Sequence, residues 1–189
     1  KSIPDHSNLI ELSEECLSNR VDKRTIHAIL DIGHLQNVSR YIANENLTDK
    51  WFDILRMLIK RSNYHIGYML DQRSNRYGND IAINIVNKGK VKSLSYLTLW
   101  SLIKEVGRSL SGFEQDQQKP IIGILSHNQL NCTLVDLACL SFGFKIVPIP
   151  LNATNEHVSF ILEHSEITHL FLGGKKGNDI WSDIIDRSL

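Results

Sequence analysis

Short apolar runs alternate with helix-like segments from Pro120 onward, and this alternation constrains the fold more than any other feature of the sequence. Residues 121–125 form a continuous apolar run, as a strand buried on both faces would. Two more strand-like runs follow at 145–150, which ends in prolines, and at 168–172, which Gly173 and Gly174 close. Strand, helix, strand, helix and strand joined by a few residues predict right-handed crossovers in a parallel sheet. We therefore expect an α/β fold with a parallel β/α sheet layer.

The segments between these runs have helical periodicity. An unusually apolar helix is predicted over 129–142 with Asn128 as its N-cap, and a shorter helix follows Thr154, which can cap it. A last helix is expected around Ile180, Trp181, Ile184 and Ile185.

Upstream, residues 63–112 combine both patterns. A short helix carrying Ile66, Met69, Leu70 and Tyr77 should stop at Gly78, and residues 80–86 alternate as a strand does, with turn residues at Asn87 and Gly89. An amphipathic helix should begin after Ser95 and end at Gly112.

Residues 1–62 are polar and helical in pattern, with no strand-like run. Asp22 can cap one helix that continues to Ile42, and Thr48 or Asp49 can cap a second. That second helix should place one apolar face inward, made of Trp51, Phe52, Leu55, Leu58 and Ile59. We predict a helical extension over 1–62 and an incomplete α/β portion over 63–189. The extension either packs on the rest of the protein or binds a partner.

The charged residues balance, with 21 Lys and Arg against 21 Asp and Glu and a formal net charge of +0. Binding to nucleic acid or to an anionic membrane surface requires an excess of positive charge, so composition favours neither. No apolar run approaches the ~18–20 residues of a membrane span, and nothing resembles a signal peptide. Cys16, Cys132 and Cys139 are too few for a disulfide framework. A cytoplasmic protein is expected, and Lys1 in place of an initial Met suggests a piece of a longer chain.

Four groups of residues resemble chemical sites, and each is better explained structurally. Ser126, His127 and Asn128 are adjacent, so their side chains diverge and a nucleophile–base pair is not expected. Residues 173–177 are rich in glycine and lysine but lack the spacing and the hydroxyl of a phosphate-binding loop. Of the group His157, His164 and His169, the first two are seven residues apart on a helix, which is too far for joint metal ligation. Cys132 and Cys139 have the same spacing on an apolar helix, where free cysteine behaves as a small apolar residue. We assign no catalytic residue, no metal ligand and no cofactor-binding residue.

A series of motifs from about Ile66 to Leu172 resembles the N-terminal part of the adenylate-forming, or AMP-binding, enzymes. In chain order these are Gly78-Asn79-Asp80-Ile81-Ala82, Ser95-Tyr96-Leu97-Thr98-Leu99, Gly123-Ile124-Leu125-Ser126-His127-Asn128, Asp136-Leu137-Ala138 with Gly143, Pro148-Ile149-Pro150-Leu151, and 156–165. The residues in these motifs are most similar to those of long-chain fatty acyl-CoA synthetases. Phe144-Lys145-Ile146 departs from the small residues usual before the Val-Pro motif, and residues 1–62 match nothing in the family.

The resemblance implies a two-step reaction. A carboxylic acid, here a fatty acid, attacks the α-phosphate of ATP to give an acyl adenylate, and a thiol, usually coenzyme A, then displaces AMP. Mg²⁺ and a lysine-containing loop rich in Ser, Thr and Gly would stabilise the phosphate charge, but the family's loop lies beyond the matched region and is absent from this sequence. The resemblance thus implies one flank of a longer acid–thiol ligase, inactive and without cofactor by itself, whose partner is the rest of the polypeptide.

Three alternatives remain at this stage. The leading one is the N-terminal segment of an ATP-dependent acyl-CoA synthetase. A second is a non-catalytic binding or scaffold protein that docks a partner through its helical extension. A third is a generic doubly wound domain with an unrelated ligand at its strand ends. If the segment has lost its covering parts, the helix at 129–142 or a sheet edge should also promote self-association.

Overall fold

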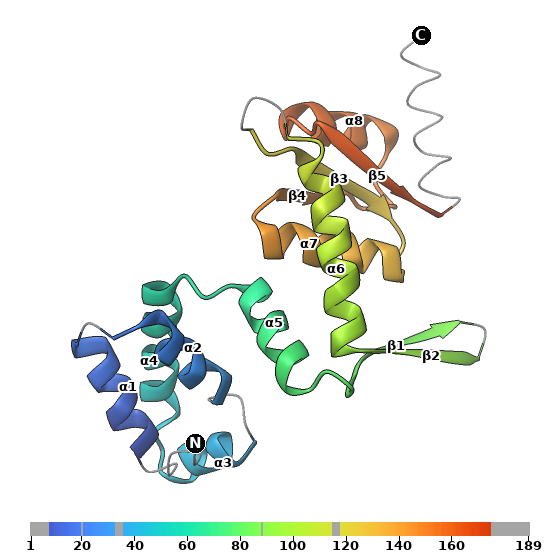
Figure 1. Ribbon diagram of the computed structural model, residues 1–189. Helices are drawn as coiled ribbons and strands as arrows, with labels where there is room; N and C mark the ends of the chain where they lie inside the picture. The colour runs from blue at the N-terminus through green and yellow to red at the C-terminus, as the bar shows by residue number, and fades with distance from the viewer. Residues whose placement is uncertain (1–7, 20, 33–35, 88, 115–117, 175–189) are drawn as a thin grey trace. The chain divides into compact units, whose positions relative to one another are not determined.

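The computed structural model describes residues 8–19, 21–32, 36–87, 89–114 and 118–174, and these residues form two compact units, Lys1–Gln72 and Arg73–Leu189 (Figure 1). The helix expected around residues 180–185 lies outside the described residues. Each unit has its own apolar core, so each is described by itself.

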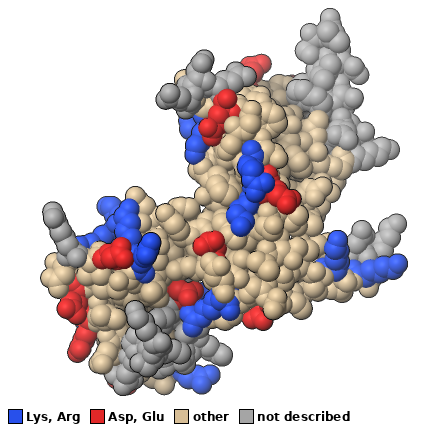
Figure 2. Space-filling view, in the orientation of Figure 1, with Lys and Arg blue, Asp and Glu red and all other residues tan. Residues whose placement is uncertain are grey.

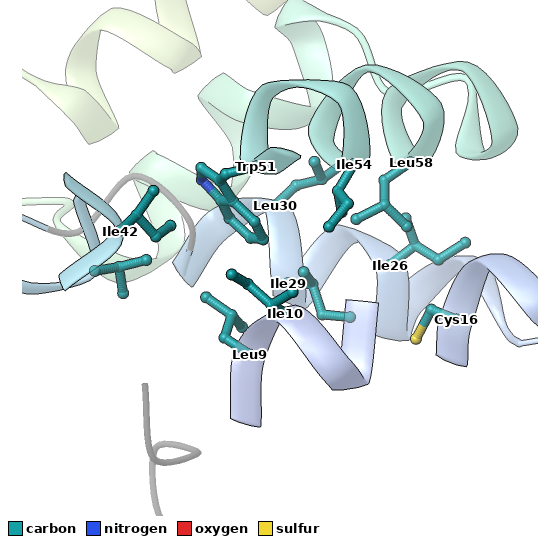
Figure 3. Close-up of a cluster of buried hydrophobic side chains, with 11 residues drawn as sticks. Leu9, Ile10, Cys16, Ile26, Ile29, Leu30, Ile42, Trp51, Ile54 and Leu58 are labelled. Atoms are coloured by element: carbon teal, nitrogen blue, oxygen red, sulfur yellow. The ribbon is translucent and has the colours of Figure 1, made fainter. Parts of the chain in front are cut away.

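The first unit is helical. It contains α1 (Leu9–Ser18), α2 (Lys23–Ile32), α3 (Gln36–Asn44), α4 (Thr48–Ser62) and most of α5 (Ile66–Arg76). Its core gathers side chains from the first four helices (Figure 3): Leu9, Ile10, Cys16, Ile26, Ile29, Leu30, Val38, Ile42, Trp51, Ile54 and Leu58. Burying this many large aliphatic groups, each contributing about 1.5–3 kcal/mol, stabilises the unit without any sheet.

Three expectations for this unit were wrong. The helix expected to run from Asp22 to Ile42 is two helices, α2 and α3, and the sequence contains Gly33, the poorest non-proline helix former, between them. Neither Thr48 nor Asp49 is the N-cap of α4; that position is Leu47, which makes no side-chain capping bond. Phe52 and Ile59 were expected to face inward but are 64% and 42% exposed. The buried stripe of α4 centres on Trp51, Ile54 and Leu58, and both side chains are turned away from it.

The second unit begins with a hairpin that leads into a long helix. Strands β1 (Ile81–Asn87) and β2 (Lys90–Ser95) pair in antiparallel fashion, and α6 (Tyr96–Ser111) follows directly. Ser95 caps α6 by accepting a hydrogen bond from the backbone N–H of Thr98 at 3.2 Å, and Gly112 ends it, as the sequence predicts. Strand β2 was not predicted, because lysines and serines interrupt its apolar alternation.

The remaining elements form the predicted parallel layer. Strands β3 (Ile121–Ser126), β4 (Lys145–Pro148) and β5 (His169–Gly173) form a parallel sheet in the order β4-β3-β5. Helix α7 (Leu130–Phe142) connects β3 to β4, and α8 (Asn155–His164) connects β4 to β5. Figure 1 shows α8 on one side of the sheet and α6 and α7 on the other. The fold class is therefore α/β with a parallel β/α sheet layer, as predicted.

Packing on the two sides of the sheet differs. Helices α6 and α7 come close enough for Trp100 and Phe142 to stack with ring centroids 6.1 Å apart. A Cβ on Gly107 would lie 2.3 Å from the Phe142 ring, so glycine is needed at this crossing. On the other side, Val158 of α8 is buried against Leu125 of β3 and Ile149.

Candidate functional site

The carboxyl ends of β3 and β5 form the candidate site. The chain leaves β3 toward β4 on one side and returns to β5 on the other, so the winding direction reverses at β3. In open α/β sheets, ligands bind outside the carboxyl ends of the strands at such a reversal. Five residues occupy this position and are called the strand-end cluster below: Ser126, His127, Gln129, Gly173 and Gly174.

Hydrogen bonds hold the strand-end cluster together. The Ser126 hydroxyl donates to the backbone oxygen of His127 at 2.9 Å and accepts from the side-chain amide of Gln129 at 3.1 Å. Ser126 also pairs with Gly173 across the sheet. A Cβ on Gly173 would lie 1.8 Å from Ser126 Oγ and 2.5 Å from Gln129 Nε2, so these two side chains cover the glycine closely.

In this geometry Ser126 stabilises the strand ends and does not act as a nucleophile. The hydroxyl proton of Ser126 is donated to a backbone oxygen, not to an imidazole, and the His127 side chain is on the exposed surface. A serine nucleophile needs a base within hydrogen-bond reach of its hydroxyl. The structure therefore brings Ser126 together with Gln129, and it does not bring Ser126 and the His127 ring into a catalytic pair.

The expected role of Asn128 was wrong. Helix α7 begins at Leu130 with Gln129 as its N-cap, and this N-cap makes no side-chain capping bond. The Gln129 side chain turns back to Ser126, three residues earlier. Sequence reasoning missed this residue because glutamine is not a preferred N-cap, and the only signal was a long amide placed just after a strand end.

Two cysteines lie on α7, the helix that follows the cluster, and neither has the environment of a reactive thiol. Burial raises the pKa of the Cys139 thiol to about 11, and the Asp136 carboxylate adds to that effect. Burial also raises the pKa of Cys132, although a hydrogen bond with Ser126 acts in the opposite direction. Reactive cysteines have lowered pKa values, so both behave as small apolar side chains.

The three histidines considered as ligands have separate surroundings. His157 lies in the first turn of α8, His164 stacks on Phe160 at 5.2 Å, and His169 stacks on Phe113 at 4.5 Å. In the described ranges, no group of three or more His, Cys, Asp or Glu side chains could hold a metal ion. Of the glycine- and lysine-rich run at 173–177, only Gly173 and Gly174 are described.

A cleft lies at the opposite, amino edge of the sheet. It is lined by Phe113, Gln118, Lys119, Pro120, Thr168 and His169. Lys119 donates to the backbone oxygen of Phe142 at 2.6 Å, and so satisfies the carboxyl end of α7 rather than facing a ligand. The Thr168 hydroxyl is bonded to the backbone of Ile121. The polar groups here are used in joining strands and helices, so the carboxyl edge remains the candidate.

Fold and site together define a doubly wound α/β layer of the kind that binds ligands at its strand ends. The profile of the AMP-binding enzymes matches residues 70–187, more than half of the sequence. The chain therefore belongs to the AMP-binding enzyme family. The ordered motifs between Ile66 and Leu172 predicted this membership.

Solved structures share the fold. The N-terminal domain of FACL13 from Mycobacterium tuberculosis is 19% identical with a TM-score of 0.54, over 63% of this chain and 29% of that one. A fatty acyl CoA synthetase from the same organism is 20% identical with a TM-score of 0.53, over 64% of this chain and 23% of that one. Coronafacic acid ligase from Pectobacterium brasiliense is 20% identical with a TM-score of 0.56, and the match covers 66% of this chain and 24% of that one.

These likenesses establish the fold and mark its extent. The chain spans less than a third of the length of each of these three structures. No curated protein matches the sequence. In the part of the chain that the structure describes, every helix is too short or too polar to cross a bilayer.

Proposed function

We propose that this chain is the N-terminal segment of an ATP-dependent acid–thiol ligase that activates a fatty acid as acyl-AMP and passes it to coenzyme A. The family match over residues 70–187 carries the proposal. Two of the structural neighbours, the fatty acyl CoA synthetase and the coronafacic acid ligase, join carboxylic acids, and this supports an acid as substrate. The motifs from Gly123 to Asn128 and from Pro148 to Leu151 favour a fatty acid over other acids.

The described residues do not fit ATP or Mg²⁺ by themselves, so no catalytic step is assigned to them. The Ser126 hydroxyl is already used twice, and Ser126 and Gln129 cover Gly173, where a phosphate would need open backbone. The segment would serve as one flank of the large domain, inactive alone, with the rest of the polypeptide as its partner.

We further propose that the helical extension ends at residue 62 and that the synthetase-like portion starts at residue 63. Helix α4 ends at Ser62, and Asn63 takes the left-handed conformation, with φ of 51°, that terminates helices. The separate core of the helical unit also favours a second candidate function, a scaffold that docks a partner through this extension. In that role, the α/β portion would be retained without catalysis.

One pair of measurements tests the proposed enzyme. In the parent gene, the sequence that follows the codon for Leu189 should encode a Ser/Thr/Gly-rich loop with a lysine, and a stop codon there would favour the scaffold. In isothermal titration with ATP and Mg²⁺, the 189-residue chain should bind negligibly, while the longer polypeptide should bind and exchange pyrophosphate when a fatty acid is present. Micromolar ATP binding by the 189-residue chain would contradict the proposal.

A further inference from the structure

A hollow lies between α6 and α7, outside the strand-end cluster. It has a volume of about 250 Å³, and its five lining residues define what is called the α6–α7 hollow below: Lys104, Gly107, Arg108, Ser111 and Phe142. Gly107 and Phe142 form its apolar part, because α6 has no side chain at Gly107 and the Phe142 ring occupies that place. The other three residues supply polar groups.

Two cations line the hollow without a carboxylate partner. Lys104 and Arg108 are exposed and lie four residues apart on one face of α6. The ion pairs of the described residues lie in the helical unit, and neither of these cations takes part in one. Figure 2 shows Lys and Arg groups over the carboxyl-terminal half of α6, with an acidic group beside them. The acidic residue of α6, Glu105, forms no ion pair with either cation, so an anion could contact both without displacing a partner.

The polar groups of the hollow are positioned and available. The Lys104 ammonium lies 5.7 Å from the centroid of the Trp100 ring, and this cation–π contact holds it beside the hollow. Trp100 in turn stacks on Phe142. The Ser111 hydroxyl has no hydrogen-bond partner among the described residues, so it can donate to a ligand.

Charge and shape select the chemistry of a ligand for this hollow. Two cations balance a dianion, whereas a carboxylate carries one negative charge and would leave one cation unmatched. Arginine presents planar donors that bind phosphate oxygens in pairs, and lysine adds a point charge. The Phe142 ring adds an apolar wall, which inorganic phosphate would not use but an aromatic ring would contact. A nucleic-acid strand requires a longer row of cations than these two.

We propose that the α6–α7 hollow binds a small phosphate monoester of a flat apolar group, with the phosphate at Lys104, Arg108 and Ser111 and the apolar group against Phe142. Its volume of about 250 Å³ is below the roughly 300–1,000 Å³ of pockets that bury a drug-sized ligand, so ATP is not expected there. The inference does not rest on the proposed enzyme activity. A scaffold with the same two helices would bind the ester equally.

Amide NMR titration of the whole isotope-labelled 189-residue chain with phenyl phosphate tests the proposal. The shifts should centre on Gly107, Arg108 and Ser111 and should leave the strand-end cluster unchanged. Phenyl phosphate should bind severalfold more tightly than inorganic phosphate, which lacks the ring, and than benzoate, which carries less charge. Arg108→Gln should weaken phenyl phosphate binding by about tenfold, because it removes a charge-assisted hydrogen-bonding group.

Matched variants separate the hollow from general charge. Arg24→Gln removes an exposed arginine from α2 and should leave phenyl phosphate binding nearly unchanged. Phe142→Leu should remove the preference for phenyl phosphate over inorganic phosphate. If that variant fails to fold, Arg108→Gln and Lys104→Gln still test the site, because both change exposed side chains only.

Several results would overturn the proposal. These are equal losses in Arg108→Gln and Arg24→Gln, benzoate binding as tightly as phenyl phosphate, shifts centred on the strand-end cluster, and no shift at millimolar phenyl phosphate. N-acetyl phosphotyrosine amide carries the same ester with added peptide groups. It should bind no more tightly than phenyl phosphate, because backbone N–H groups within helices are already bonded. Much tighter binding of this amide would assign the hollow to a phosphorylated peptide and overturn the assignment to a small ester.

Discussion

Replacing Gly173 with alanine should disrupt the strand-end cluster by a steric mechanism that can be measured. The added Cβ would lie 1.8 Å from Ser126 Oγ and 2.5 Å from Ser126 Cβ. The hydroxyl could rotate away, but the position of Ser126 Cβ is fixed by its backbone. Since Cβ atoms do not approach closer than 3.0 Å, β3 and β5 would have to separate by about 0.5 Å at this pair.

The expected cost follows from that displacement. Overpacking of a well-packed site costs about 1–3 kcal/mol, and the lower unfolded-state entropy of alanine recovers only about 0.4–1 kcal/mol. Gly173→Ala should therefore destabilise β3 and β5 by about 1–2 kcal/mol. Ser126→Gly removes the two Ser126 atoms and leaves only the amide end of the flexible Gln129 side chain, which can move. The double variant should therefore be more stable than the sum of the single changes predicts, by about 1 kcal/mol or more.

Hydrogen exchange on peptides from β3 and β5 is the suitable assay, because a chain with two compact units need not unfold in one step. Gly112→Ala is the matched control. Its Cβ would lie 3.2 Å from the Ser109 oxygen at the end of α6, so a change of only a few tenths of a kcal/mol is expected. Additive effects of Gly173→Ala and Ser126→Gly, or equal exchange in Gly173→Ala and Gly112→Ala, would refute the steric reasoning.

Three further predictions concern α6 and α7. Ser95→Ala removes the side-chain acceptor for the Thr98 N–H and should destabilise α6 by about 0.5–2 kcal/mol, whereas Ser109→Ala on the exposed side should change little; hydrogen exchange across α6 distinguishes them. Cys139 should resist alkylation at pH 8 in the folded chain while Cys132 reacts slowly, as mass spectrometry would show. Because the pKa of Cys139 is raised from 9.0 to about 11, the unfolded chain loses this proton first, so stability should fall as pH rises through that interval; a rise there would contradict the assigned burial.

The sheet and its helices could be predicted from the sequence because their signals are strong and local. The continuous apolar run of five residues at β3 is typical of a strand that is buried on both faces of a sheet. Ser95 and Thr154 are good N-caps, and each lies directly before an amphipathic helix. Strand β2 could not be predicted in the same way. It is stabilised by pairing with β1 and not by its own residues, of which only Leu94 is buried.

The site was harder to predict than the fold. Ser126 was singled out, but its partner Gln129 was not, because the contact depends on where the chain turns after β3. The close approach of Gly173 to Ser126 depends on the register of two strands separated by 42 residues of chain, and local sequence carries no information about it. On α4 the helical period was read correctly, yet the centre of the buried stripe depends on which neighbours pack against it.

The overall charge composition is likewise a poor guide to whether the chain can attract a polyanion. A balance of 21 against 21 charges argues against polyanion binding only if the charges are mixed evenly over the surface. In this chain the acidic residues are absent from the hairpin and from the first two turns of α6, and the structure places Lys90 and Lys92 on the same face of β2. Electrostatic attraction is screened within about 10 Å, so the field near the hairpin depends on these local charges and not on the net charge of the whole chain.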